Sequence, residues 1–457
     1  MADRTWHQRG NGDELARSII HPNKNGQYDV VDYDNGLPIS LADGANLDAF
    51  SRLRMSEPKL IWENKSVTRK DIHSHQEVIT GAGSSSTWRS AEASIRLTCD
   101  TGASDKVIRQ SKKYLPYIPG NSQLSFFTFN LISQPEANCV KRVGRFDSND
   151  GMFLEWNGTD TRFVVRTSTS GSASDASYAT QANWNLDTLD GTGNSNNPSG
   201  ITLDLTKVQI LIVDYQWLGV GRVRFGFDID GKVIYCHEFN HANASTIVYT
   251  QTPNLPVRHE ISNTGVTSAS DYMDVICSSV MSEGNNSPLA HDFSIDTGAG
   301  VAVSTTRVPV LAIRQSLTYN TKVNRRISFL NSLGLISLGD NIIYELRQYP
   351  SPDITITGDW IDLDADHSTL QYAVGTNIVV NSETDSHPFY KDFLASSSLG
   401  SKINPGAGIS SLGIRTHHNE MLVNYDGTAC EVIVVWAKSL SATGSTVWAT
   451  ANCVEYD

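Results

Sequence analysis

The stretch between Thr206 and Phe239 constrains the fold more than any other part of the chain. Residues 208–214 form an uninterrupted β-branched and aliphatic run, and residues 222–230 then alternate between charged and apolar side chains. A period of two is the pattern of a half-buried strand. Asp230-Gly231 follows, a dipeptide preferred in two-residue hairpin loops because both residues can adopt positive φ. Residues 232–239 then restart the strand pattern.

This pattern predicts a three-stranded antiparallel meander over residues 207–217, 222–229 and 232–239. The alternation places the charged residues on one face, which we expect to be wet, and the apolar residues on the other. Three strands with one buried face are the smallest stable sheet, so we predict an all-β protein. The charged set is Arg222, Arg224, Asp228 and Asp230, and the apolar set is Val223, Phe225, Phe227 and Ile229.

Length and composition agree with a β-rich protein of more than one domain. The chain has 457 residues, of which 39% are hydrophobic and 19% charged. Two or three domains are expected at this length. The net charge of −13 argues against an electrostatic interaction with nucleic acid. We find no window long and apolar enough for a membrane span and no signal-peptide core near Met1.

The six cysteines lie far apart and form no C-x-x-C pair. We interpret them as buried small hydrophobic residues, since this number and spacing suit neither a disulfide scaffold nor a zinc ribbon. The alternative is one oxidised pair in an extracellular particle, Cys430 with Cys453, near the ends of neighbouring predicted strands. The six are Cys99, Cys139, Cys236, Cys277, Cys430 and Cys453.

Residues 1–47 do not have the pattern of a domain. Turn dipeptides such as Asn25-Gly26 and Asn35-Gly36 recur between short extended pieces, and the apolar residues are too scattered for a core. We expect an extended N-terminal assembly arm that another subunit holds in place.

The first folded domain is predicted at residues 48–305 as a jelly-roll-like or concanavalin-like β-sandwich. Many short strands separated by turn signals are typical of such folds. We expect a surface loop at residues 171–200, which carries Trp184. Besides the meander, the predicted strands are 76–80, 87–98, 123–133, 140–147, 152–156, 161–167, 257–261 and 273–282.

A second, smaller β-sandwich is predicted at residues 306–457, after a boundary in the Gly-, Ser- and Thr-rich stretch 285–305. Residues 388–404 are expected to form a short helix or a loop. The predicted strands are 307–318, 325–331, 342–349, 370–374, 377–381, 409–415, 429–438 and 446–454.

One segment matches the zinc-protease pattern H-E-x-x-H, with His237, Glu238 and His241. That chemistry needs a helix, which places the two imidazoles one turn apart. Here the segment follows the returning strand of the hairpin, so Glu238 points away from His237. We predict no zinc at these residues.

Three further segments resemble binding motifs without their structural context. His73 and His75 share a predicted strand face and His417-His418 are adjacent, but no further ligand is fixed by spacing, so we expect solvated faces. Leu218-Gly219-Val220-Gly221-Arg222 resembles a phosphate loop, yet it joins two strands. Its glycines indicate a sharp corner of the sheet.

Carboxylates and loop aromatics leave two functions open. A glycosidase needs a carboxylate pair across a cleft, and Glu155 with Asp228 or Asp230 is conceivable, although no spacing selects them. Trp184 and Tyr178 could stack on sugars or anchor an interface. We assign no catalytic, cofactor-binding or metal residue and expect no cofactor.

Several longer phrases resemble virion structural proteins of tailed bacteriophages, a family with relatives in large DNA viruses. The resemblance covers about residues 48–285. Its segments are Asp48–Pro58, Arg142–Asp147, Asn183–Gly193, Trp217–Phe227, Tyr249–Glu260 and Cys277–Gly284.

The resemblance implies a component of a virion, assembled in the host cytoplasm, and it carries over no catalytic residue. We therefore expect a non-enzymatic fibre, spike or collar protein that attaches to head, neck or tail subunits through its arm, with a homotrimer favoured. The alternatives are capsid decoration, a receptor-recognition module that binds host glycans, and, less favoured, a polysaccharide-degrading enzyme. Neither nucleic acid nor membrane is an expected partner.

Overall fold

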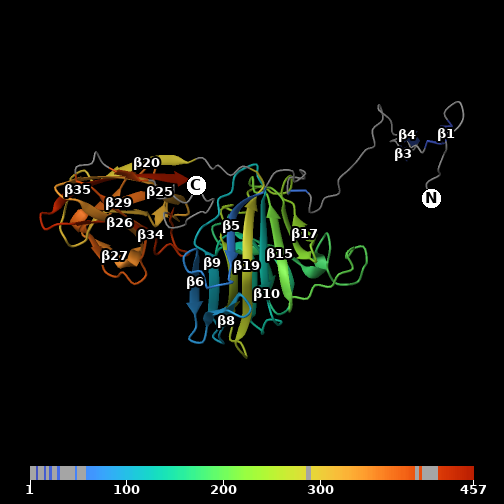
Figure 1. Ribbon diagram of the computed structural model, residues 1–457. Helices are drawn as coiled ribbons and strands as arrows, with labels where there is room; N and C mark the ends of the chain where they lie inside the picture. Colours follow the sequence, from blue (N-terminus) through green and yellow to red (C-terminus); the bar gives the residue numbers. More distant parts are fainter. Residues whose placement is uncertain are drawn as a thin grey trace. The chain divides into compact units, whose positions relative to one another are not determined.

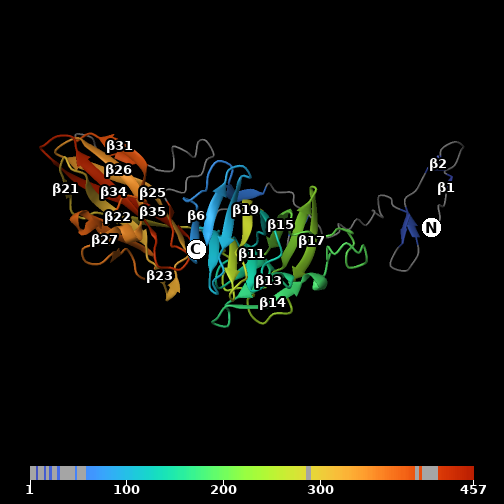
Figure 2. The same cartoon turned by 90° about the horizontal axis from the view of Figure 1, so that it is seen from below.

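The computed structural model describes residues 7–8, 15–16, 20–22, 28–30, 47–48, 58–284, 290–396, 401–403 and 420–456. In these ranges the regular structure is β, and the helical turns are three short 3₁₀ helices: η1 (Gln181–Asn183), η2 (Ser351–Asp353) and η3 (Gly375–Asn377). No helix in the same ranges is long and apolar enough to cross a membrane. The predicted all-β class is confirmed (Figures 1 and 2).

The chain divides into two compact units, residues 1–44 and 45–457. In the first unit β1 (His7–Gln8) pairs with β2 (Leu15–Ala16), and β3 (Ile20–Pro22) pairs with β4 (Tyr28–Val30). The unit ends at Gly44, whereas the predicted N-terminal arm ended at residue 47. Leu47 and Asp48 belong to the second unit, where both are buried.

The first sandwich consists of two antiparallel sheets (Figure 1). The eight-stranded sheet runs in the order β17 (Lys232–Phe239), β16 (Val223–Ile229), β15 (Val208–Tyr215), β10 (Gln123–Asn130), β19 (Asp271–Ser282), β8 (Ser94–Cys99) and β7 (Ser85–Arg89), while β5 (Lys59–Lys65) also pairs with β19. The seven-stranded sheet runs in the order β14 (Ser174–Thr180), β13 (Thr161–Thr167), β12 (Gly151–Trp156), β11 (Cys139–Phe146), β18 (Val257–Asn263), β9 (Lys106–Ser111) and β6 (His75–Thr80).

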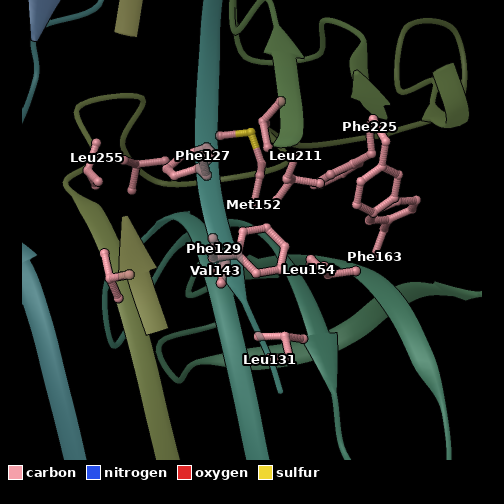
Figure 3. Packing of buried hydrophobic residues seen from close by; sticks show 14 of the residues in the cluster. Phe127, Phe129, Leu131, Val143, Met152, Leu154, Phe163, Leu211, Phe225 and Leu255 are labelled. Carbon is pink, nitrogen blue, oxygen red and sulfur yellow. The ribbon is translucent and has the colours of Figure 1, made fainter. Parts of the chain in front are cut away.

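Aromatic and aliphatic side chains fill the space between these sheets (Figure 3). On β10, every second residue is buried, so Phe127 and Phe129 point into the core. Phe163 of the opposite sheet stacks on Phe225 with ring centroids 4.5 Å apart and on Trp184 at 4.4 Å. Burying one such side chain fully contributes about 1.5–3 kcal/mol, so the cluster as a whole stabilises the sandwich strongly.

The predicted meander is present as β15, β16 and β17. Asp230 and Gly231 have φ of 54° and 77°, as a two-residue hairpin loop requires. The prediction of one wet face is wrong at Arg224, which is 1% exposed. Its guanidinium pairs with Asp214 and donates to the carbonyl of Leu47 at 2.8 Å, because residues 47–48 lie over this face.

The connection from β15 to β16 is the predicted sheet corner. Gln216 N–H donates to the carbonyl of Arg222, and Gly221 N–H to that of Trp217. Gly219 has φ of 81°, and a Cβ at Gly221 would lie 2.5 Å from the Gln216 carbonyl oxygen. The glycines therefore allow a close turn of the backbone rather than a phosphate site.

Three expectations for the first sandwich need correction. Residues 87–98 are not one strand, since β7 and β8 form a hairpin whose turn includes Ala93 at φ 49°. The expected loop 171–200 contains the edge strand β14, and Trp184 within it is buried rather than exposed. The strands β5 and β9 were not predicted.

The second sandwich also has two antiparallel sheets. The first contains β20 (His291–Asp296), β35 (Ser445–Tyr456), β25 (Ile327–Leu338) and β32 (Ser401–Ile403) in order, with β21 (Val301–Val303) on β35 and β33 (Glu420–Met421) on β25. The other runs β28 (Ile361–Asp362), β29 (Leu370–Val374), β22 (Val308–Gln315), β34 (Glu431–Ser439), β26 (Ile342–Pro350) and β31 (His387–Leu394). Two small ribbons pair β23 (Thr318–Tyr319) with β24 (Lys322–Val323) and β27 (Ile354–Ile356) with β30 (Ile378–Val380).

A main core fills the second sandwich, and a separate apolar cluster lies on the other face of the sheet that contains β34. In this second cluster Ile354 and Ile378, from the β27–β30 ribbon, join Val432, Val434 and Trp436 of β34. The ribbon thus covers the sheet with apolar side chains.

Three expectations for the C-terminal region also change. Strands β20 and β21 pair with β35, so residues 291–303 belong to the second sandwich and the boundary lies before the predicted residue 305. Residues 387–394 form strand β31 rather than a helix or loop. The predicted strand 409–415 lies outside the described residues. Cys430 and Cys453 are free buried thiols in different clusters, so the alternative disulfide is not formed.

Candidate functional site

A groove of about 310 Å³ over the outer face of the seven-stranded sheet gathers charged side chains, and Tyr425 of the second sandwich also lines it. Its residues come from different strands because register partners point to the same side of a sheet. Arg142 on β11 is the partner of Glu155 on β12 and of Glu260 on β18. Glu155 is in turn the partner of Arg162 on β13. These four side chains form a row of alternating charge across four strands.

Short hydrogen bonds connect each member of this row. Arg142 donates from Nε to Glu155 at 2.7 Å and from Nη1 to Glu260 at 2.8 Å. Arg162 donates from Nε to the second oxygen of Glu155 at 2.7 Å. Glu155 is 1% exposed, so its charge is neutralised by two guanidiniums rather than by water.

A second set of contacts extends the row along the groove. Arg166 forms a bidentate pair with Asp175 of β14, with bonds of 2.7 and 2.8 Å. Arg258 donates from Nε to Glu260 at 2.9 Å. Under these guanidiniums lie the rings of Phe146 and Phe153, which belong to a small buried cluster with Val164. Arg258 lies 5.1 Å from the Phe146 ring centre and Arg166 lies 5.0 Å from that of Phe153.

The electrostatics of the groove keep its acids ionised. Burial by itself raises the pKa of Glu260, but Arg258 and Arg142 outweigh burial and hold this pKa well below its usual range. Burial also raises the pKa of Asp175, and the hydrogen bonds from Arg166 reverse the shift to a net lowering. A glycosidase general acid needs the opposite, a raised pKa. The groove can therefore present fixed charges to a ligand but has no proton to donate from these groups.

The carboxylates considered for catalysis are not brought together. Glu155 points to the outer face of the seven-stranded sheet, whereas Asp228 lies on β16 of the eight-stranded sheet and Asp230 in the hairpin loop after it. Of the two candidate stacking aromatics, Trp184 is in the core. Tyr178 is 49% exposed, with the Arg162 guanidinium 4.7 Å from its ring centre. It remains the exposed aromatic at the edge of this face.

The residues of the zinc-like segment have protein partners. His237 accepts a hydrogen bond at Nδ1 from the Asn185 N–H at 3.2 Å, and burial lowers its pKa to about 4. Glu238 forms an ion pair with Arg222 at 3.2 Å. His241 donates from Nδ1 to the Gly221 carbonyl and stacks on Tyr249 at 4.3 Å. Strand β17 ends at Phe239, so the helical spacing that zinc requires is not formed.

The other histidines also lie apart from a metal-like arrangement. The expectation that His73 and His75 share a solvated strand face is wrong, because β6 begins at His75 and that ring is buried against Trp62. His73 instead faces His387, with ring centres 5.2 Å apart. His417 and His418 lie outside the described residues. Across the ranges described, no three His, Cys, Asp or Glu side chains group as metal ligands.

Reasoning from the sequence missed the charged row beside the groove, apart from naming Glu155. Arg142, Glu155 and Arg162 are visible in the sequence as charges within strands, and Glu260 appears in the same way on β18. What assembles them is the pairing register, which no local pattern of the chain contains. A search for opposite charges at matching positions of neighbouring predicted strands is the signal that would have found them.

No family model and no curated protein matches the chain. Among solved structures, a legume lectin-like domain from Entamoeba histolytica aligns at 9% identity over 46% of this chain and 90% of its own, with a TM-score of 0.27. A glycoside hydrolase family 16 endo-glucanase from Bacteroides ovatus aligns at 8% identity over 48% and 99%, with a TM-score of 0.31. The Emp47p carbohydrate recognition domain aligns at 12% identity over 49% and 96%, with a TM-score of 0.29. At these scores the alignments carry no information on activity.

Proposed function

We propose that this protein is a non-enzymatic structural component of a tailed-bacteriophage virion, attached to other virion subunits through its N-terminal unit. The observation that carries the proposal is the division of the chain at residue 44. The described strands of the first unit are two or three residues long, and they pair only within that unit. Such short pairs cannot enclose a core, so a neighbouring subunit would supply the missing contacts.

The chemistry of the charged row supports a role without catalysis. Glu155 and Glu260 are each held by two guanidiniums, and the lowered pKa of Glu260 opposes proton donation. A buried network of this kind fixes neighbouring strands in one register. We infer that it serves the rigidity of the sandwich rather than a reaction.

The resemblance of residues 48–285 to virion proteins implies a component of the particle. We place the protein in a fibre, spike or collar, as a homotrimer that assembles in the host cytoplasm. Its partners are capsid, neck or tail subunits. Capsid decoration is the alternative position, and the edges that β14 and β17 leave at the ends of their sheets suit assembly with neighbouring copies.

Removal of residues 1–44 tests the attachment. We expect the truncated protein to fold with a melting temperature close to that of the full chain, because Leu47, Asp48 and both sandwiches are retained. Incorporation into particles, measured by mass spectrometry of purified virions, should fall at least tenfold. The matched control deletes residues 9–14 only, between β1 and β2, and is expected to reduce incorporation less.

Two results would contradict this proposal. Normal incorporation of the truncated chain would place the docking surface in the sandwiches. Release of reducing sugar from host envelope polysaccharide by the purified protein would instead indicate the polysaccharide-degrading alternative. Loss of that activity on replacing Asp175, a carboxylate that lines the groove, would locate it there.

A further inference from the structure

A cavity of about 460 Å³ lies where the two sandwiches meet within the unit 45–457. The first sandwich contributes residues just before and within β6 and just after β9, among them Gln76 and Lys112. The second contributes the end of β26, the loop that leads into β31, and the segments on either side of the 424–429 turn, with Tyr349, Asp385 and Glu431. Its volume falls in the range of small-molecule sites, which often occur between domains.

Direct contacts between the sandwiches fix the walls of this cavity. Lys112 and Glu431 form an ion pair at 2.9 Å across it. The Tyr425 N–H donates to Gln76 Oε1 at 3.1 Å. Beside it, the Arg325 guanidinium lies 4.1 Å from the ring centre of Tyr114. A cavity held from both sides in this way is formed before a ligand arrives, which lowers the entropy cost of binding.

The lining combines an apolar surface with unsatisfied polar groups. Ile72, Pro350 and Leu422 supply apolar contact, and Ile72 is 62% exposed. The amide of Gln76 is oriented by its bond from Tyr425, and its buried Nε2 has no hydrogen-bond partner among the described residues. Thr384 and Asp385 lie exposed on the loop before β31 and add a hydroxyl and a carboxylate.

Charge selects among the ligands that such a lining could hold. Lys112 is neutralised by Glu431, which leaves Asp385 as the remaining formal charge of the lining when the histidines are neutral. An anionic ligand would therefore meet a carboxylate without a compensating cation. A neutral ring with several hydroxyls suits the lining better, since a carboxylate accepts two hydroxyl hydrogen bonds and an amide N–H donates one.

We propose that this cavity binds one or two units of a neutral saccharide, with Asp385 and Gln76 as the polar contacts and Ile72 and Pro350 against the apolar face of the sugar. The residues that line this cavity are not those that line the charged groove. The proposal does not depend on the structural role proposed above, and saccharide binding can be measured on the isolated protein.

An array of neutral oligosaccharides, with sialylated and sulfated oligosaccharides as the charge comparison, tests this proposal on the full-length protein. We expect binding to neutral glycans only. The strongest neutral glycan is then titrated by calorimetry against Asp385→Ala and Thr384→Trp, which remove the carboxylate and fill the cavity. Each should weaken binding at least tenfold. Asp292→Ala, an exposed carboxylate on β20 outside the cavity, is the matched control and should bind as the unmodified chain does.

Several outcomes would overturn the assignment. No binding to any neutral glycan, or a preference for the acidic ones, would exclude the proposed ligand class. Unchanged binding by both cavity variants would place the site elsewhere. Loss of binding in Tyr178→Ala with the cavity variants unaffected would move it to the edge strand β14 of the first sandwich. Because the cavity variants change exposed residues, their melting temperatures should match that of the control.

Discussion

The two sandwiches cover the outer face of a sheet in opposite ways. In the first, the face of the seven-stranded sheet carries the row Arg162, Glu155, Arg142 and Glu260. In the second, the β27–β30 ribbon lays Ile354 and Ile378 on the apolar residues of β34. Both faces are largely removed from water. The comparison shows that a strand with alternating charges does not by itself indicate a solvated face, because paired charges can cover a sheet as completely as an apolar ribbon.

The largest expected effect comes from removing the central cation of the charged row. Arg142→Leu leaves Glu155 with one guanidinium instead of two and takes one from Glu260. Breaking a buried ion pair at one partner costs about 3–5 kcal/mol. We expect the first sandwich to lose stability by this amount in urea denaturation. The double variant Arg142→Leu with Glu155→Leu should lose less than the single one, since it removes the uncompensated charge.

The matched change in the second sandwich is Ile378→Ala, at a side chain 4% exposed in the apolar cluster. It should cost about 2–3 kcal/mol, toward the lower end for such truncations because an edge ribbon can relax. No second substitution next to Ile378 should recover the lost stability, in contrast to the double variant Arg142→Leu with Glu155→Leu. If Arg142→Leu cost less than 1 kcal/mol, the charged row would be a solvated surface feature and the contrast between the sandwiches would disappear.

Sequence patterns predicted the strands in which polar and apolar residues alternate and the strands that are continuously apolar. The contrast between the two sheet faces explains which strands and residues they missed. The meander and its Asp230-Gly231 loop were predicted because their signals are local. Strand β9 was missed since its sequence, Lys-Val-Ile-Arg-Gln-Ser, mixes charges that the fold buries, including Arg109 at 1% exposed. Arg224 was placed in water for the same reason. Burial of a charge depends on a partner on a neighbouring strand, here Asp214 on β15 or Glu77 on β6.

The candidate sites were less predictable than the fold. Glu155 was considered as one of a catalytic pair, but its actual neighbours are cations contributed by β11 and β13. The cavity between the sandwiches joins Gln76 to a loop that follows it by more than three hundred residues. Neither arrangement leaves a periodic pattern in the sequence, so both could be recognised only once the pairing of the strands was known.

Acidification should destabilise the first sandwich more than the second, and we expect an effect of intermediate size. Burial lowers the pKa of His75 to about 4 against the opposing bond to Asp71, and lowers that of His259 to about 3, with Arg109 nearby. Asp71, Glu77 and Trp62 also face His75. Because these pKa values lie below that of an unfolded histidine, about 6.5, the unfolded chain binds protons first. Stability is therefore complete above pH 6.5 and falls as the pH drops toward 4.

For each of these two imidazoles the expected loss at pH 5 is about 2 kcal/mol relative to pH 8. Hydrogen exchange measured by mass spectrometry reports the two sandwiches separately, and protection should fall in peptides of the first. His291 and His367 of the second sandwich are exposed, so His291→Gln serves as a control without effect. Equal loss of protection in both sandwiches would show that the buried histidines do not determine the acid response.

The smallest effect concerns one turn in each sandwich. Gly231 and Gly427 have φ of 77° and 76°, a region that costs an L-residue about 1–2 kcal/mol. A Cβ at Gly231 would meet no atom within 4 Å, whereas one at Gly427 would lie 2.8 Å from a methyl group of Val323. Gly231→Ala should therefore lower stability by the backbone cost alone, and Gly427→Ala by more. A reversed order in thermal denaturation would mean that the 424–428 turn adapts more easily than the hairpin loop.

Strand β35 gives the second sandwich a particular order of completion during synthesis. It lies between β20 and β25 and also pairs with β21, yet it follows all three in the chain. When synthesis has reached Ala442, every strand of the first sandwich is present, but the second sandwich still lacks β35. Any product that stops before Ser445 would leave β20, β21 and one edge of β25 without their neighbour. Such a fragment would be exposed to proteases and to pairing with other nascent chains, so this half can complete its fold only after β35 has been synthesised.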